Sequence, residues 1–222
     1  MKTPVNKSTL KQHFTYYWWL YLLVAVIAVL GVNLLYTVTA YRVPNDRKIR
    51  MIVYGLADQE GVDHYMESIR QSDLSDMEKM DSEQIPPDDL NGLSTLSTRV
   101  YASDGDIYVL PLDTFISYAE SGVLMPLEDD KELMEILGDR ADVTRGWRTL
   151  RDSEESHLFG IPLNQLPGLA SYVYAERGFI CVAYGSTNPD NTLKFFRILC
   201  RDMLTAPETD ATETASPSPE TP

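Results

Sequence analysis

The 222-residue sequence contains 33 Asp and Glu against 19 Lys and Arg, which gives a formal net charge of −14. Three of the bases, Lys2, Lys7 and Lys11, and no acid lie in the first 15 residues, so the rest of the chain has 33 acids and 16 bases, a balance of −17. An acidic surface of this size repels phosphate backbones, so the composition argues against nucleic acid as a partner and suits a well-solvated domain.

An apolar segment without any charge spans residues 16–38. As a helix it would be about 34 Å long, enough to cross the hydrocarbon core of a bilayer. Aromatic residues gather at its two ends, as in the interfacial belts of membrane helices: Tyr16, Tyr17, Trp18, Trp19 and Tyr21 at one end, Tyr36 and Tyr41 at the other. The segment therefore predicts a single transmembrane helix in contact with the lipid bilayer.

Two properties of this segment stay open in the sequence. Val38, Thr39 and Ala40 also fit the cleavage site of a signal peptide, although the apolar run is longer than a usual signal core. The flanking bases do not decide the orientation, because they are nearly balanced between the two sides: Lys2, Lys7 and Lys11 before the segment, and Arg42, Arg47, Lys48 and Arg50 after it.

The first half of the remaining chain alternates between strand-like and helix-like segments. A short linker at residues 39–48 precedes a branched apolar run at 49–54, which predicts a buried strand. Residues 58–70 have the spacing of an amphipathic helix, and 72–84 predict a weaker helix or a loop. Two short strands are predicted at 98–102 and 106–110.

The second half continues the alternation. Pro111 is expected to open a helix that ends at Gly122, and a helix at 129–137 is expected to stop at Gly138. A loop at 141–156 and an extended piece at 160–163 follow, and then a hairpin formed by strands at 171–175 and 179–184. Asn188 and Pro189 predict the start of the last helix.

This pattern predicts five parts: a short basic N-terminal tail (1–15), the transmembrane helix (16–38), the linker (39–48), an α/β domain (49–204) and a disordered acidic tail (205–222) rich in Thr, Pro and Ser. Cys181 and Cys200 match no metal motif, and they are equally consistent with a disulfide and with buried free thiols.

Several motifs in this order resemble the extracellular solute-binding proteins of bacterial ABC transporters, the sugar and peptide type. They are a first strand IRMIVY, the strand, helix and stop DIYVLP, TFISYAESG and VLMPLED, the segment FGIPL, and a late strand followed by STNPDNTLKFFRIL. The resemblance covers about residues 47–204. It implies a three-layer α/β lobe and a place outside the membrane, and a role as an accessory to solute uptake or sensing.

The resemblance also has a gap. The family inserts a second lobe after the FGIPL segment, whereas only residues 164–178 are available here. A single lobe has one wall and cannot close a hinge around a small ligand. We therefore expect a surface-exposed module that meets a partner protein, such as a permease or a sensor, and binds carbohydrate or peptide weakly. The alternative is a degenerate lobe that only folds.

Candidate ligand contacts are residues expected at the carboxyl ends of the strands, where open α/β sheets bind. Asp113 follows a strand, Trp147 has a ring that can stack on a sugar, and Asn164 and Gln165 follow the FGIPL segment. Each has a plainer interpretation, as a helix cap, a core residue or turn residues. The sequence has no recognised nucleophile, metal or phosphate-binding motif, so we expect neither an enzyme nor a cofactor.

Overall fold

The structure is a computed structural model that describes residues 7–87, 91–174 and 177–205. The chain divides into two compact units, Met1–Arg42 and Val43–Pro222, which are described one at a time. Apart from Thr205, the predicted disordered tail lies outside the described residues, and so do the first six residues of the predicted N-terminal tail.

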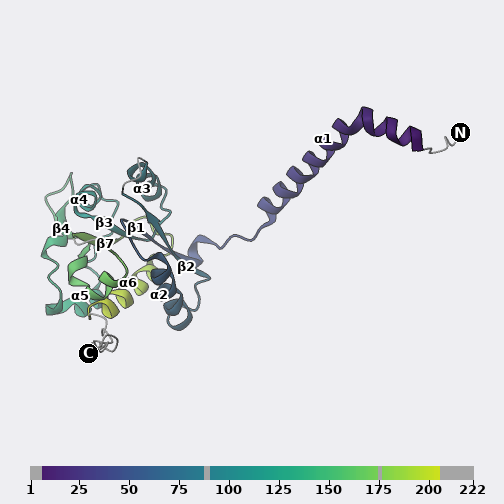
Figure 1. The fold of residues 1–222 in the computed structure, drawn as a ribbon. Helices are drawn as coiled ribbons and strands as arrows, with labels where there is room; N and C mark the ends of the chain where they lie inside the picture. The colour runs from purple at the N-terminus through teal and green to yellow at the C-terminus, as the bar shows by residue number, and fades with distance from the viewer. Residues whose placement is uncertain (1–6, 88–90, 175–176, 206–222) are drawn as a thin grey trace, which may run out of the picture. The chain divides into compact units, whose positions relative to one another are not determined.

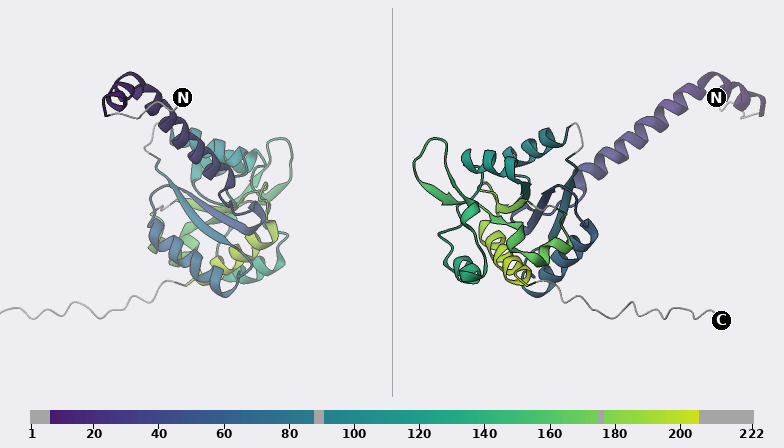
Figure 2. Two further views of the ribbon diagram at one scale, coloured as in Figure 1. Left: turned by 90° about the vertical axis from the view of Figure 1, so that its right-hand side faces the viewer. Right: turned by 60° about the vertical axis from the view of Figure 1, so that its left-hand side comes forward.

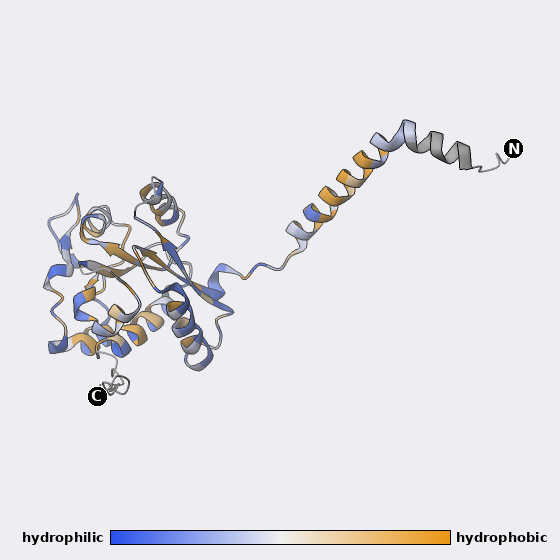
Figure 3. Ribbon diagram, viewed as in Figure 1, coloured by the Kyte–Doolittle hydropathy of each residue, from blue (hydrophilic) through white to orange (hydrophobic). Residues whose placement is uncertain are grey.

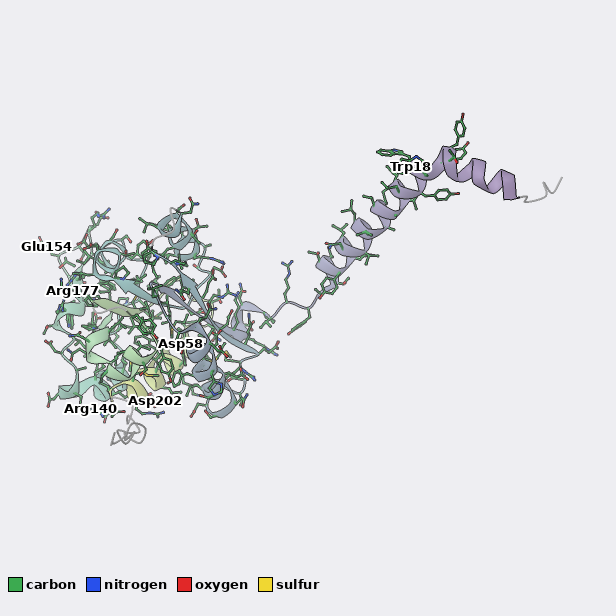
Figure 4. All side chains as sticks on the ribbon, in the orientation of Figure 1. Trp18, Asp58, Arg140, Glu154, Arg177 and Asp202 are labelled. Carbon is green, nitrogen blue, oxygen red and sulfur yellow. The ribbon has the colours of Figure 1, made fainter. Side chains whose placement is uncertain are left out.

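The first unit consists of one long helix, α1 (Lys7–Thr39). Its portion Thr15–Thr39 is long and apolar enough to cross a membrane, by a test of length and composition that a signal sequence would also satisfy. Figure 3 shows this portion as a largely hydrophobic band, and Trp18, labelled in Figure 4, lies near its beginning. The helix therefore includes the predicted span 16–38 and begins earlier, within the predicted tail.

The second unit is built on a five-stranded sheet with the order β2-β1-β3-β7-β6. The strands are β1 (Lys48–Tyr54), β2 (Lys79–Ile85), β3 (Ile107–Pro111), β6 (Ile161–Pro162) and β7 (Gly178–Val182). β1 pairs in parallel with β2 and β3, whereas β7 runs antiparallel to β3 and β6. A separate two-stranded sheet joins β4 (Trp147–Thr149) and β5 (Ser156–Leu158).

Helices cover both faces of the five-stranded sheet (Figures 1 and 2). One face carries α2 (Gln59–Ser72) and α6 (Pro189–Met203), with α5 (Lys131–Leu137) beside α6, and the other carries α3 (Gly92–Tyr101) and α4 (Leu112–Glu120). Strand residues alternate between the two cores: Met51 and Val53 pack on the α2 and α6 side, and Ile52 packs on the α3 and α4 side. The lobe therefore has the three-layer α/β architecture that was predicted.

Short 3₁₀ turns complete the lobe at Asn45–Arg47, Gly138–Arg140, Thr144–Gly146, Leu163–Gln165 and Pro167–Ser171. The predicted helix ends are confirmed at Gly122 and Gly138, whose φ angles of 74° and 42° lie in the left-handed region. The predicted start of α6 at Pro189 is confirmed too, although the side chain of Asn188 donates to the carbonyl of Asp46 (2.6 Å) and does not cap the helix.

Two strand predictions were wrong. Residues 98–102, predicted as a strand from their β-branched and aromatic content, form the last turn of α3 and the residue after it, with Val100 buried one turn after Leu96. The described part of the predicted strand 171–175, residues 171–174, does not pair with β7, because β3 and β6 already pair with both sides of β7. Instead Val173 bridges to Ala57 beyond the end of β1.

The prediction of a helix or a loop for residues 72–84 was also wrong in part, since Lys79–Ile85 is the edge strand β2. The strand was hidden because its exposed face carries charged residues, which leaves little hydrophobic alternation to detect. Both cysteines are free and buried, and they lie in different cores: Cys181 on the α3 and α4 side and Cys200 on the α2 and α6 side. A disulfide between them is therefore absent.

Candidate functional site

The topology selects one edge of the sheet as a binding position. The connection from β1 to β2 runs through α2 on one face, and the connection from β2 to β3 runs through α3 on the other face. Open α/β sheets bind ligands outside the carboxyl ends of the strands at such a change of side. We call the ends of β1, β2, β3 and β6, with the loops that follow them, the carboxyl edge.

The loop after β1 is held at this edge by a second segment of the chain. The Asp58 amide donates to the Tyr172 carbonyl (2.8 Å), and the Tyr174 amide donates to the Leu56 carbonyl (2.9 Å). These bonds flank the bridge between Ala57 and Val173. The side chains of Leu56 and Tyr174 remain 58% and 65% exposed, so a fixed backbone holds two large apolar groups in solvent.

Side chains from α2 form hydrogen bonds with the backbone of β2, the neighbouring edge strand. The Ser82 amide in β2 donates to Oδ1 of Asp63 (2.6 Å), and Gln59 donates to the Ser82 carbonyl (3.0 Å). Asp58, labelled in Figure 4, caps the same helix by accepting from the Gly61 amide (3.1 Å). Occupied backbone groups in the middle of an edge strand discourage pairing with another strand, which leaves the carboxyl edge as the more accessible surface.

Two of the predicted site residues lie at the carboxyl edge. Asp113 is exposed in the first turn of α4, directly after β3, and Asn164 is exposed in the 3₁₀ turn after β6. β3 and β6 both run antiparallel to β7, so they end on the same side of the sheet. Neither side chain has a hydrogen bond or ion pair within the described part of the chain.

The other two predicted residues are engaged elsewhere. Gln165 uses Oε1 to accept a hydrogen bond from the Asp142 amide (2.9 Å), which ties down the loop after α5. Trp147 is half-buried against the core on the α2 and α6 side and pairs in register with Leu158, which precedes β6. The structure therefore brings Asp113 and Asn164 to one edge, whereas Gln165 and Trp147 make structural contacts.

Three exposed residues of this edge were not found from the sequence. They are Leu56, Tyr174 and Leu93, which is 55% exposed in the first turn of α3, after the end of β2. The signal for Leu56 was its position just after Tyr54-Gly55 at the end of the first strand. Tyr174 had no usable signal, because its position depends on a contact with a segment far away in the sequence.

The opposite edge of the sheet, which we call the amino edge, contains a network of charges. The guanidinium nitrogens of Arg50 in β1 lie near three carboxylates, at 3.4 Å from an oxygen of Asp81, 3.9 Å from one of Glu83 and 3.3 Å from one of Asp104. Arg99 from the end of α3 pairs with Glu83 (2.8 Å) and with Asp104. Acids and bases therefore neutralise one another here, and the amino edge has a structural role in the lobe.

Two carboxyl groups of the lobe have pKa values that are shifted in opposite directions. Burial raises the pKa of Asp106, although hydrogen bonds from Ser186 (2.7 Å) and from the Arg50 amide (2.9 Å) oppose the shift. The pKa of Glu128 is lowered overall. Burial alone would raise it, but hydrogen bonds with backbone amides and with His157 (2.5 Å) stabilise the ionised form more strongly. No cluster of three metal-ligating side chains occurs among the described residues.

Comparisons with known proteins found similarity to solved structures alone. No family model and no curated protein matches the sequence. Solved structures do match: a family 1 extracellular solute-binding protein from Alicyclobacillus acidocaldarius is 20% identical over 52% of this chain and 27% of its own, with a TM-score of 0.40. The chain resembles one truncated lobe of an extracellular solute-binding protein.

Two further matches have the same extent. An ABC substrate-binding protein from Listeria monocytogenes in complex with cycloalternan is 18% identical over 51% of this chain and 28% of its own, with a TM-score of 0.35. A periplasmic oligogalacturonide-binding protein from Yersinia enterocolitica is 18% identical over 52% and 27%, with a TM-score of 0.38. The chain thus matches only about a quarter of the length of each of these proteins.

Proposed function

We propose that the chain is a membrane-anchored binding module whose carboxyl edge meets a partner protein in an uptake or sensing system, such as a permease or a sensor. The observation that carries the proposal is the pair Leu56 and Tyr174, which the backbone fixes in an exposed position where the sheet connections change side. Exposed aromatic and aliphatic anchors of this kind are typical of protein interfaces. The module binds and has no catalytic role.

A protein partner suits a single lobe better than a small molecule does. Pockets for small ligands enclose most of the ligand surface, which needs walls on both sides. Between β6 and β7, the described residues 163–174 and 177 contribute two 3₁₀ turns and no opposing lobe. Carbohydrates or peptides should therefore bind weakly, on one face, and no hinge closure should accompany their binding.

In this proposal α1 is the anchor and the lobe lies outside the cell. The length and hydropathy of Thr15–Thr39 support a bilayer span. Extraction of membranes with alkaline carbonate should leave the full-length chain in the pellet, and protease added to intact cells should digest the lobe. Release of the chain by carbonate would contradict the anchoring. Protection of the lobe from protease until the cells are lysed would contradict the orientation.

The interface is tested by two matched double variants of the full-length chain. Leu56→Ser with Tyr174→Ser removes the apolar pair of the carboxyl edge, and Tyr101→Ser with Tyr184→Ser removes two tyrosines of similar exposure at the amino edge. After cross-linking in cells, the first variant should lose a membrane-protein adduct that the second retains. Equal adducts in both would contradict the carboxyl edge as the interface, and no adduct even from the unsubstituted chain would point to a lobe that only folds.

A further inference from the structure

The apolar portion of α1 contains an amide side chain, Asn33, at membrane depth. The span Thr15–Thr39 has its middle at Ile27, so Asn33 lies about 9 Å from the middle along the helix axis. This is inside the hydrocarbon core, whose half-thickness is roughly 15 Å. An amide in hydrocarbon is unfavourable until it finds a hydrogen-bond partner.

The helix itself does not provide that partner. The hydroxyls of Thr37 and Thr39 donate to carbonyls one turn back, those of Asn33 (2.8 Å) and Leu35 (2.6 Å). The Asn33 carboxamide is exposed and has no hydrogen bond among the described residues. The helix thus satisfies the hydroxyls of Thr37 and Thr39 internally, whereas the Asn33 amide requires a partner outside α1.

Asn33 lies on a continuous helix face with the spacing of a coiled coil. Steps of three and four residues connect Trp19, Leu22, Val26, Val29, Asn33 and Tyr36. On the same side a shallow groove of about 490 Å³ is lined by Ala28, Val29, Val32, Asn33 and Tyr36. This repeat is the one that brings two helices together at a small crossing angle, with a polar residue at one position setting the register.

We propose that α1 pairs in parallel with a second copy of itself, with the two Asn33 carboxamides hydrogen-bonded to each other. The proposal rests on the membrane anchoring proposed above. A carboxamide contains both a donor and an acceptor, so it is complementary to its own copy. Every copy of a single-pass chain inserts in the same direction and brings Asn33 to the same depth, which makes a second copy the occupant that fits this face.

Cysteine scanning of the full-length chain in native membranes tests the face. Val26→Cys and Val29→Cys introduce thiols on it, and Ile27→Cys and Leu34→Cys place them on the opposite side of the helix. Cys181 and Cys200 are fully buried in the lobe, so the unsubstituted chain serves as the background. Under mild oxidation, the first two variants should form an adduct of twice 25.1 kDa, and the other two should not.

Three further variants in the Val29→Cys background test the amide. Asn33→Leu should weaken self-association roughly 3- to 30-fold, the range that measured hydrogen bonds between membrane helices span. Asn33→Gln keeps an amide and should retain most of the adduct. The double change Asn33→Leu with Leu34→Asn keeps the composition but moves the amide around the helix, and it should lose the Val29→Cys adduct.

The outcomes separate this inference from the proposed anchoring. Alkaline carbonate extraction is performed on the same membranes: a chain that is released shows that the anchoring itself is wrong. A chain that stays in the pellet but cross-links equally from all four positions, or keeps its adduct with Asn33→Leu, overturns the pairing. An adduct of a mass other than twice that of the chain would identify a different membrane helix and would also overturn it.

Discussion

The two edges of the sheet use their side chains in opposite ways. At the amino edge, Arg50 and Arg99 are committed to Asp81, Glu83 and Asp104 in one network of short contacts. At the carboxyl edge, large apolar side chains and two polar ones face solvent without a partner among the described residues: Leu56, Leu93, Tyr174, Asp113 and Asn164. Charges that pair within the chain stabilise the lobe, whereas the unpaired surface is the part available to another molecule.

The largest expected effect comes from breaking the amino-edge network. Arg50→Met removes the base that contacts all three of Asp81, Glu83 and Asp104, although Lys79 still pairs with Asp81 and Arg99 with the other two. The variant should lower the free energy of unfolding by about 2 kcal/mol. That is less than the roughly 3–5 kcal/mol for a fully buried pair, because these side chains are 19–31% exposed. Urea denaturation of residues 43–205 measures it. Arg145→Met, at an exposed position, is the control and should change stability by less than about 0.5 kcal/mol.

A smaller effect is expected for Glu128→Gln. The folded pKa of Glu128 is depressed, so its ionised form contributes stability that is present above the unfolded pKa, near 4.3, and is lost as the pH falls through the folded pKa. The variant should be about 1 kcal/mol less stable at neutral pH, and the difference from wild type should shrink on acidification. A difference that grows as the pH falls would contradict the assignment.

Asp106→Asn should show the opposite dependence on pH. The folded pKa of Asp106 is raised by burial, so its protonated form stabilises the fold below the unfolded pKa, near 3.9, and that contribution is lost as the pH rises through the folded pKa. Wild type should therefore lose stability relative to the variant as the pH increases above about 4. Urea midpoints from pH 4 to 7 measure this, and a parallel pair of curves would show that Asp106 is not perturbed.

The smallest effects are expected at the carboxyl edge. Leu56→Ser with Tyr174→Ser removes exposed side chains and should change the free energy of unfolding by less than about 0.5 kcal/mol for each position. Monosaccharides should not shift the unfolding temperature of the lobe measurably, because one wall encloses too little of the ligand. A clear, saturable shift would show that the lobe contains a closed site.

The sequence predicted the parts of the lobe that depend on local apolar pattern. β1, β3, β7, α4 and α6 follow from apolar runs or helical spacing together with proline and glycine signals. β2 was not predicted, because several of its residues are charged and take part in salt bridges, which leaves no clear hydrophobic alternation in the sequence. α3 was misassigned because β-branched and aromatic residues favour strands locally, whereas in the folded chain Leu96 and Val100 are buried one helical turn apart.

In the candidate site too, the residues that follow a strand were predictable from the sequence, and those placed by long-range contacts were not. Asp113 and Asn164 were predicted because each directly follows a strand, and the parallel ends of β3 and β6 bring them to one edge. Gln165 follows the same strand, but its hydrogen bond to the Asp142 amide is a long-range contact that no local pattern contains. Tyr174 reaches the edge only through its pairing with Leu56, so it becomes visible only in the folded chain.

Site-specific photo-cross-linking shows whether the carboxyl edge is the binding surface. A photo-reactive phenylalanine analogue replaces Tyr174 or, as the matched control, Tyr184, in the full-length chain in living cells; the two tyrosines are 65% and 68% exposed. The account predicts a discrete protein adduct from position 174 and none from position 184. An adduct from 184 alone, or equal adducts from both, would contradict it.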